Sequence, residues 1–161
     1  AVPPTSPQDR AQLDARRKQL QREVHPDRFA SQGAAAQRVA MQWSVRINEA
    51  YQRLKDPIKR ASYLCTLNAA PIDAEHNTAM PADFLMQQME WRESLDDAHD
   101  GKALEALHDE VDAARRRALS SLDWLIDEKG AYVEAAAQVR ALMFIERFAK
   151  DVEAKLDRLG Q

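Results

Sequence analysis

The sequence predicts an all-α protein in which a helical hairpin is joined to an antiparallel three-helix bundle. The chain is rich in Ala, Leu, Arg, Glu and Gln, which favour helices, and its 161 residues include only 4 Gly, which disfavours a turn-rich β fold. Apolar residues recur every three or four positions, the spacing of one helix face. Prolines and glycines lie between these periodic segments.

The first predicted helix covers residues 9–24. The proline-rich segment 1–8 before it is expected to be a loose lead-in. The helix carries an apolar stripe of Leu13, Leu20 and Val24. Pro26 ends it, because the residue before a proline avoids the helical conformation. Residues 25–34 are therefore predicted to form a loop.

The second predicted helix covers residues 35–55 and has one apolar face that is expected to be buried. That face consists of Val39, Ala40, Trp43, Ile47, Ala50, Tyr51 and Leu54. Pro57 suits the first turn of a further short helix, predicted over residues 57–67. The first two helices then form an antiparallel hairpin whose tip is the loop at 25–34.

The segment NAAPIDAEHNTAMP has two prolines and no sustained period, so we place a domain boundary there. The predicted domains are 1–68 and 82–161, and residues 69–81 link them. Three further helices are predicted at residues 82–98, 102–126 and 131–159. Short connections at Gly101 and Gly130 make them antiparallel neighbours. The last two helices carry core stripes of Leu104, Leu107, Val111, Ala114, Ala118 and Leu125, and of Ala141, Ile145, Phe148, Val152 and Leu159.

Charge is distributed unevenly along the chain. Residues 1–63 contain 12 Lys and Arg against 6 Asp and Glu, a net charge of +6, whereas residues 64–161 contain 11 against 20, a net charge of −9. Opposite signs on the two halves indicate two modules with different partners, although chance patterning of solvated helix faces is the alternative.

The tripeptide His25–Pro26–Asp27 at the predicted hairpin tip has three possible interpretations: a catalytic pair, a metal ligand, or a loop that contacts a partner. No serine-nucleophile motif or glycine-rich phosphate loop accompanies it, and a hairpin tip excludes water poorly. The other histidines lack metal-ligand spacing, and Cys65 is the single cysteine. A contact loop is favoured, with an ordinary turn as the alternative.

The surroundings of this tripeptide resemble a J domain. A basic helix precedes it, and the following helix ends in NEAYQRLKDPIKRASYL. The resemblance implies that the tripeptide and the basic helix engage a DnaK-type ATPase chaperone. The residues expected at this contact are His25, Pro26, Asp27, Arg16, Arg17, Lys18, Arg22 and Arg28. The cations would steer encounter with an acidic surface, and the proline would keep the loop rigid.

The helix predicted at 82–98 has two apolar faces. One face consists of Phe84, Trp91, Leu95 and Ala98, which suffice for a bundle core. The opposite face carries Leu85, Met86 and Met89 beside Glu90, Glu93 and Asp97. Methionines rimmed by charge are typical of a binding surface, and packing against the other module is the alternative. Phe144 could belong to the core or to this surface.

Four segments together resemble the HscB family of iron–sulfur-cluster co-chaperones: HPDRFAS, KDPIKRASYL, DFLMQQMEWRESLDD and VRALMFIERF. The likeness runs from about Leu13 to Leu159. It implies an L-shaped molecule whose J domain stimulates the ATPase of the chaperone HscA and whose bundle binds the scaffold IscU. The scaffold contact it implies consists of Leu85, Met86, Met89, Glu90, Glu93, Asp97 and Phe144.

The sequence departs from this family pattern in two places. The family begins with a short helix packed on the hairpin, which this sequence is expected to lack, and Met89 stands where leucine is usual. We expect a cytoplasmic, non-enzymatic co-chaperone without cofactor, metal, nucleic-acid or membrane partner. Two alternatives stay open: a nucleic-acid-binding module that uses the basic face, and a small enzyme that uses Glu90 and Glu93.

Overall fold

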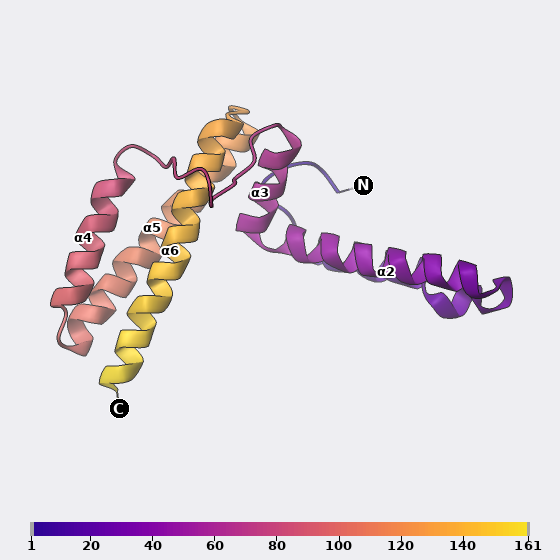
Figure 1. The fold of residues 1–161 in the computed structure, drawn as a ribbon, viewed down its shortest axis with the longest axis horizontal. Coiled ribbons are helices and arrows are strands. Elements are labelled where there is room, and N and C mark those ends of the chain that lie inside the picture. Colours follow the sequence, from indigo (N-terminus) through magenta and orange to yellow (C-terminus); the bar gives the residue numbers. More distant parts are fainter. Residues whose placement is uncertain (1, 161) are drawn as a thin grey trace.

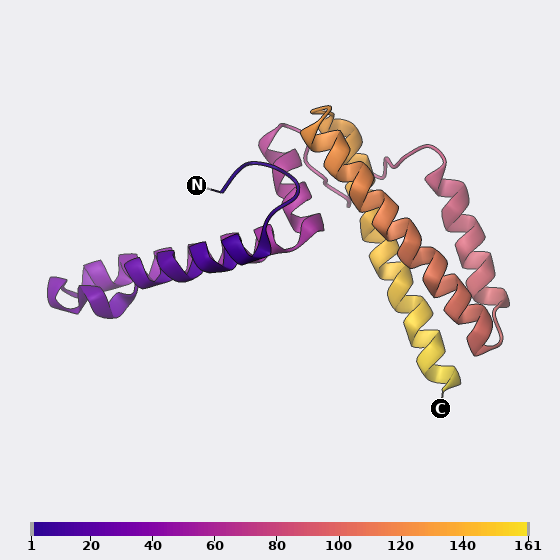
Figure 2. The same cartoon turned by 180° about the vertical axis from the view of Figure 1, so that it is seen from behind.

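The computed structural model describes residues 2–160, and every regular element in that range is helical, which confirms the predicted fold class. In chain order the elements are α1 (Arg10–Glu23), the 3₁₀ helix η1 (Pro26–Gln32), α2 (Ala34–Lys55), α3 (Pro57–Leu67), α4 (Phe84–Asp97), α5 (Gly101–Asp127) and α6 (Tyr132–Leu159). They form two arms that meet at α3 in an L (Figure 1). Seen from behind, α1 runs along α2 (Figure 2). Residues 1 and 161, at the ends of the predicted domains, lie outside the described range.

The hairpin helices begin and end within one residue of the predicted bounds. The Asp9 carboxylate accepts hydrogen bonds from the backbone N–H groups of Ala11 and Gln12, which caps α1. The loop predicted at 25–34 contains a short regular element, because residues 26–32 form η1. Pro26 occupies its first position, where the fixed φ of proline suits a helix start.

The predicted buried face of α2 is only partly buried. Ala40 and Tyr51 are buried, whereas Val39 and Trp43 are 53% and 51% exposed. The stripe on α1 is narrow, and Leu13 is its only fully buried member. One narrow helix does not cover the wider apolar face of α2, so part of that face stays open to solvent.

Helix α3 connects the two arms. The Asp56 side chain caps it by accepting from the backbone N–H groups of Ile58 and Lys59. Ala61, Leu64 and Cys65 are buried in the same apolar cluster as the bundle core, where α3 packs against α6. Helix α3, which was predicted as part of the first domain, thus shares the core of the predicted second domain. The domain division at residues 69–81 stays a prediction.

The segment before α1 is not a loose lead-in over its described part. Ser6 is 1% exposed: its Oγ donates to Asp123 Oδ1 at 2.5 Å, and its N–H donates to Asp127 Oδ1 at 2.9 Å. Arg60 Nε of α3 donates to the Ser6 carbonyl. Desolvation lowers the pKa of the buried Arg60, and the nearby carboxylates of Asp123, Asp56 and Asp127 oppose this shift. Ser6 thus ties α3 to α5 at the junction of the arms.

The bundle core is built on α5 and α6, and α4 adds an aromatic layer. Trp91 stacks on Phe148 with ring centroids 5.6 Å apart, and Phe84 lies edge-on to Phe144 at 5.7 Å. The predicted stripes are confirmed except at Leu159, which is 48% exposed in the last turn of α6. Core residues that the stripes omitted are Leu122, Ile126, Ala135, Ala136, Val139 and Leu142.

Candidate partner-binding sites

The His25–Pro26–Asp27 tip lies at the far end of the hairpin arm and faces solvent. The side chains of His25 and Asp27 are 58% and 92% exposed. The His25 Nδ1 atom accepts a hydrogen bond from the Asp27 backbone N–H at 3.2 Å and lies 3.7 Å from the Asp27 carboxylate. The pair is therefore accessible to a partner at the end of the hairpin arm.

Four local features hold the tip in one conformation. Pro26 fixes its own φ, and His25 caps η1. The Arg28 N–H donates to the His25 carbonyl at 3.0 Å, and Arg28 Nη1 donates to the carbonyl of Arg22 at the end of α1 at 3.2 Å. The tip is therefore fastened to the basic helix. A tip ordered in advance loses little entropy when a partner binds.

Most of the predicted basic residues are free to meet a partner. Arg16, Lys18, Arg22 and Arg28 are exposed. Lys18, Gln21, Arg22 and His25 line a hollow of about 430 Å³ beside the tip. Arg17 is placed differently: its Cζ lies 4.2 Å from the centre of the Tyr51 ring, and its Nε is buried without a hydrogen-bond partner among the described residues. Arg17 therefore helps to pack α1 on α2.

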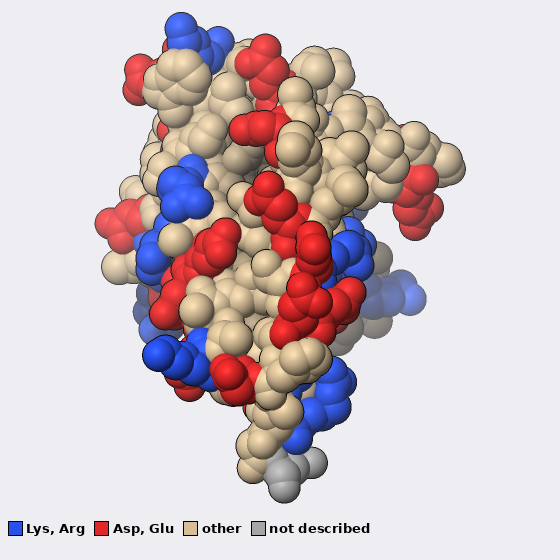
Figure 3. All heavy atoms as spheres, turned by 90° about the vertical axis from the view of Figure 1, so that its left-hand side faces the viewer, with Lys and Arg blue, Asp and Glu red and all other residues tan. Residues whose placement is uncertain are grey.

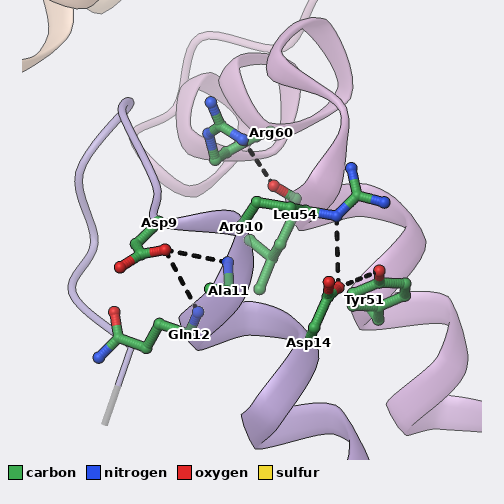
Figure 4. Close-up of polar contacts among 8 residues, drawn as sticks. All are labelled: Asp9, Arg10, Ala11, Gln12, Asp14, Tyr51, Leu54 and Arg60. Atoms are coloured by element: carbon green, nitrogen blue, oxygen red, sulfur yellow. Dashed lines mark hydrogen bonds and ion pairs between the residues drawn. The ribbon is translucent and has the colours of Figure 1, made fainter.

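The packing of α1 on α2 also depends on a polar cluster around Tyr51 that periodicity could not reveal. The Tyr51 hydroxyl donates to the Asp14 carboxylate, and Arg10 Nε lies 3.3 Å from the same oxygen (Figure 4). The hydrogen bond from Tyr51 lowers the pKa of Asp14, the bond from Arg10 adds to this effect, and desolvation opposes it. Arg10 and Lys55 also approach the Tyr51 ring, at 5.7 and 5.4 Å.

We expect Tyr51→Phe to destabilise the protein at neutral pH and to matter less in acid. The native pKa of Asp14 lies below the unfolded-state value of 3.8. The stabilisation that the hydrogen bond from Tyr51 gives to the ionised carboxylate is therefore complete above 3.8, and it is lost as the pH falls through the lower native value. The difference in stability between the wild type and Tyr51→Phe is measured from their urea unfolding midpoints at pH 7 and near pH 3. An equal gap between the two proteins at both pH values contradicts the assigned hydrogen bond.

The second candidate site is the outer face of α4. Leu85, Met86 and Met89 are 64%, 67% and 65% exposed. Glu90, Glu93 and Asp97 beside them are exposed too, and Figure 3 shows acidic side chains interspersed with uncharged ones on this side of the bundle. We name these six residues the α4 face. The alternative in which the other module covers the three apolar side chains is wrong, because all three are largely exposed and the hairpin arm joins the bundle where α3 packs against α6.

Phe144 lies in the core behind this face. It is 6% exposed, its ring stacks on Phe148, and its edge contact is with Phe84. The Arg92 guanidinium lies 5.3 Å above the Phe144 ring. Phe144 therefore supports α4 from α6, and the outer side of α4 itself carries the exposed apolar atoms.

Among residues 2–160, no group of three or more His, Cys, Asp and Glu side chains is placed to hold a metal ion. The candidate pair Glu90 and Glu93 lies on an exposed helix surface. Across the same range, no helix combines the length and the apolar character that a bilayer crossing requires.

Comparison with known proteins assigns the family. Residues 80–153 match the family model described as the HSCB C-terminal oligomerisation domain. A co-chaperone protein HscB homolog from Burkholderia multivorans is 53% identical over 154 residues, which cover 94% of this chain and 87% of the relative. The chain belongs to the HscB co-chaperone family. The HscB homolog from Burkholderia thailandensis is 51% identical with the same coverage.

Solved HscB structures share the fold of nearly the whole of this chain. Chaperone HscB from Vibrio cholerae superposes with a TM-score of 0.79 at 34% identity, covering 98% of this chain and 94% of that one. The human co-chaperone protein HscB superposes with a TM-score of 0.83 at 25% identity, covering 95% of this chain and 77% of the human one. These matches confirm the resemblance and the all-α HscB fold.

Proposed function

We propose that this chain is a non-enzymatic adaptor in iron–sulfur cluster assembly. Its hairpin tip engages a DnaK-type ATPase chaperone of the HscA kind and stimulates ATP hydrolysis, and its α4 face binds an IscU-type scaffold. The observation that carries the proposal is the presence of two exposed, chemically different surfaces on separate arms of an HscB-family fold. The cluster is cargo of the scaffold, so the proposal places no metal on this chain.

The hairpin surface suits an acidic partner. Lys18, Arg22 and Arg28 present positive charge beside the tip, and complementary charge accelerates encounter with an acidic surface. Asp27, 92% exposed, would pair with a basic group of the partner once it has docked. The ordered tip supports a defined docking geometry.

The α4 face suits a partner with an apolar patch next to basic groups. Two methionines and a leucine form an adaptable apolar contact, and the carboxylates of Glu90, Glu93 and Asp97 flank it. An apolar centre with a charged rim is the usual anatomy of a protein interface. Phe144 would act in this contact by holding α4 in place.

The arrangement of the arms supports simultaneous binding. The tip and the α4 face lie on different arms, and the short α3 joins the arms through a buried core (Figure 1). Binding to both partners raises the effective concentration of the scaffold near the chaperone. The domain division at 69–81, the residue assignments and a cytoplasmic location stay predictions.

A reconstituted ATPase assay tests the proposal. We expect the full chain and the scaffold together to raise ATP turnover by the chaperone more than either does alone. Turnover that the chain does not change, with or without scaffold, contradicts the adaptor role. Salt-sensitive binding to DNA or RNA by the same preparation would instead favour the nucleic-acid alternative.

A further inference from the structure

Arg140 is a buried guanidinium that reaches from α6 into the segment before α4. The residue is 5% exposed. Its Nε donates to the Ile72 carbonyl at 2.8 Å, one terminal nitrogen donates to the Ala79 carbonyl at 2.9 Å, and the other lies 3.4 Å from the Pro71 carbonyl. The planar fork of arginine can bridge such separated acceptors, which a lysine ammonium cannot match.

The bridged segment has little regular structure of its own. Residues 70–81 contain no helix, and Asp73 has a positive φ of 42° in a turn closed by the hydrogen bond from the Asn77 N–H to its carbonyl. Arg140 contacts this segment on both sides of the turn, at residues 71–72 and at residue 79. One side chain therefore fixes both ends of the loop.

The position of this segment determines where α4 begins. The Phe84 N–H donates to the Pro81 carbonyl at 3.0 Å, and Gln88 Nε2 donates to the Met80 sulfur at 3.0 Å. The N-cap residue Asp83 makes no side-chain capping bond, and the first turn contains no acidic residue. The start of α4 thus takes its position from residues 79–81.

We infer that Arg140 is a positioning residue for scaffold binding. It fixes Ala79, two residues before Pro81, and thereby places the first turn of α4, which carries Leu85 and Met86. The inference rests on the proposed scaffold contact of the α4 face. An apolar contact whose backbone is already ordered binds more tightly than one that must be ordered on docking.

Two substitutions of Arg140 test the inference in the full chain. In Arg140→Met all three donations are lost, and in Arg140→Lys the charge remains but the fork is lost. We expect the affinity for an IscU-type scaffold to fall roughly tenfold in Arg140→Met and less in Arg140→Lys. Amide hydrogen exchange should quicken at residues 84–88 and stay unchanged at the centre of α5. Chaperone stimulation without scaffold should not change, because it depends on the other arm.

A matched control is Lys150→Met, which removes an exposed cation from the same helix. It should leave both readouts at wild-type values. Wild-type affinity in both Arg140 variants would overturn the inference, provided that Leu85→Ala weakens binding. If Leu85→Ala is also without effect, the proposed α4 face fails as well. If Arg140→Met does not fold, the test rests on amide hydrogen exchange at residues 84–88 in Arg140→Lys. Wild-type exchange rates there would overturn the inference.

Discussion

Replacing His25 by Gln or Asp27 by Asn is expected to abolish stimulation of the chaperone ATPase while leaving the fold intact. Both side chains are largely exposed, and their mutual contacts lie within the tip. Truncation of exposed side chains usually changes the free energy of unfolding by less than about 0.5 kcal/mol. Substitution of a central interface residue, by contrast, reduces the binding free energy by at least about 2 kcal/mol, which corresponds to a loss of roughly 30-fold in affinity.

The chain supplies a matched control for this experiment. His76 and Asp73 form a second exposed histidine–aspartate pair, with Nδ1 and Oδ1 2.9 Å apart, in the segment between α3 and α4. His76→Gln and Asp73→Asn make the same chemical changes away from the hairpin tip. They should leave ATPase stimulation unchanged.

Two kinetic measurements distinguish a direct contact between the tip and the chaperone from a loss of electrostatic steering. Both the ATPase rate at saturating co-chaperone and the concentration for half-maximal stimulation should be measured, because loss of steering by Arg22 or Lys18 alters only the second. Full stimulation by His25→Gln and by Asp27→Asn would contradict the assignment of the tip as the chaperone contact. An equal loss in the His76 and Asp73 controls would point to a nonspecific cause.

Helix positions were readily predicted because they follow local rules. Pro57 starts α3 and its capping residue is Asp56, so the predicted span 57–67 matches the structure at both ends. The outward Leu85, Met86 and Met89 were also recognisable, because a bundle helix needs only one apolar stripe. Periodicity thus located one of the two candidate surfaces, and the tripeptide motif located the other.

Polar contacts between distant residues could not be predicted in the same way. Ser6 bonds to residues more than a hundred positions away, and Arg140 bonds to backbone carbonyls, which every sequence offers equally. Neither contact produces a period or a motif. The same limit affected Phe144, because its place between the core and the α4 face depends on how α4 packs on α6.

The double substitution Leu85→Ala, Met86→Ala is expected to reduce scaffold affinity by roughly 30-fold to several hundred-fold. Each side chain is about two-thirds exposed, so each can be buried by a partner, and central apolar contacts cost about 1–2 kcal/mol each on truncation. Isothermal titration of the full chain with the scaffold measures the loss. Stimulation of the chaperone without scaffold should be unchanged.

Two further variants make this result interpretable. Met41→Ala removes a methionine of similar exposure, 58%, from the hairpin arm and should leave scaffold affinity unchanged. Phe144→Ala should weaken scaffold binding for a different reason, since removing this buried ring costs about 3–5 kcal/mol of folding stability and loosens the support of Phe84 in α4. If the double variant binds the scaffold as the wild type does, the partner contacts another part of the bundle. If Phe144→Ala loses affinity without losing stability, its ring touches the scaffold directly.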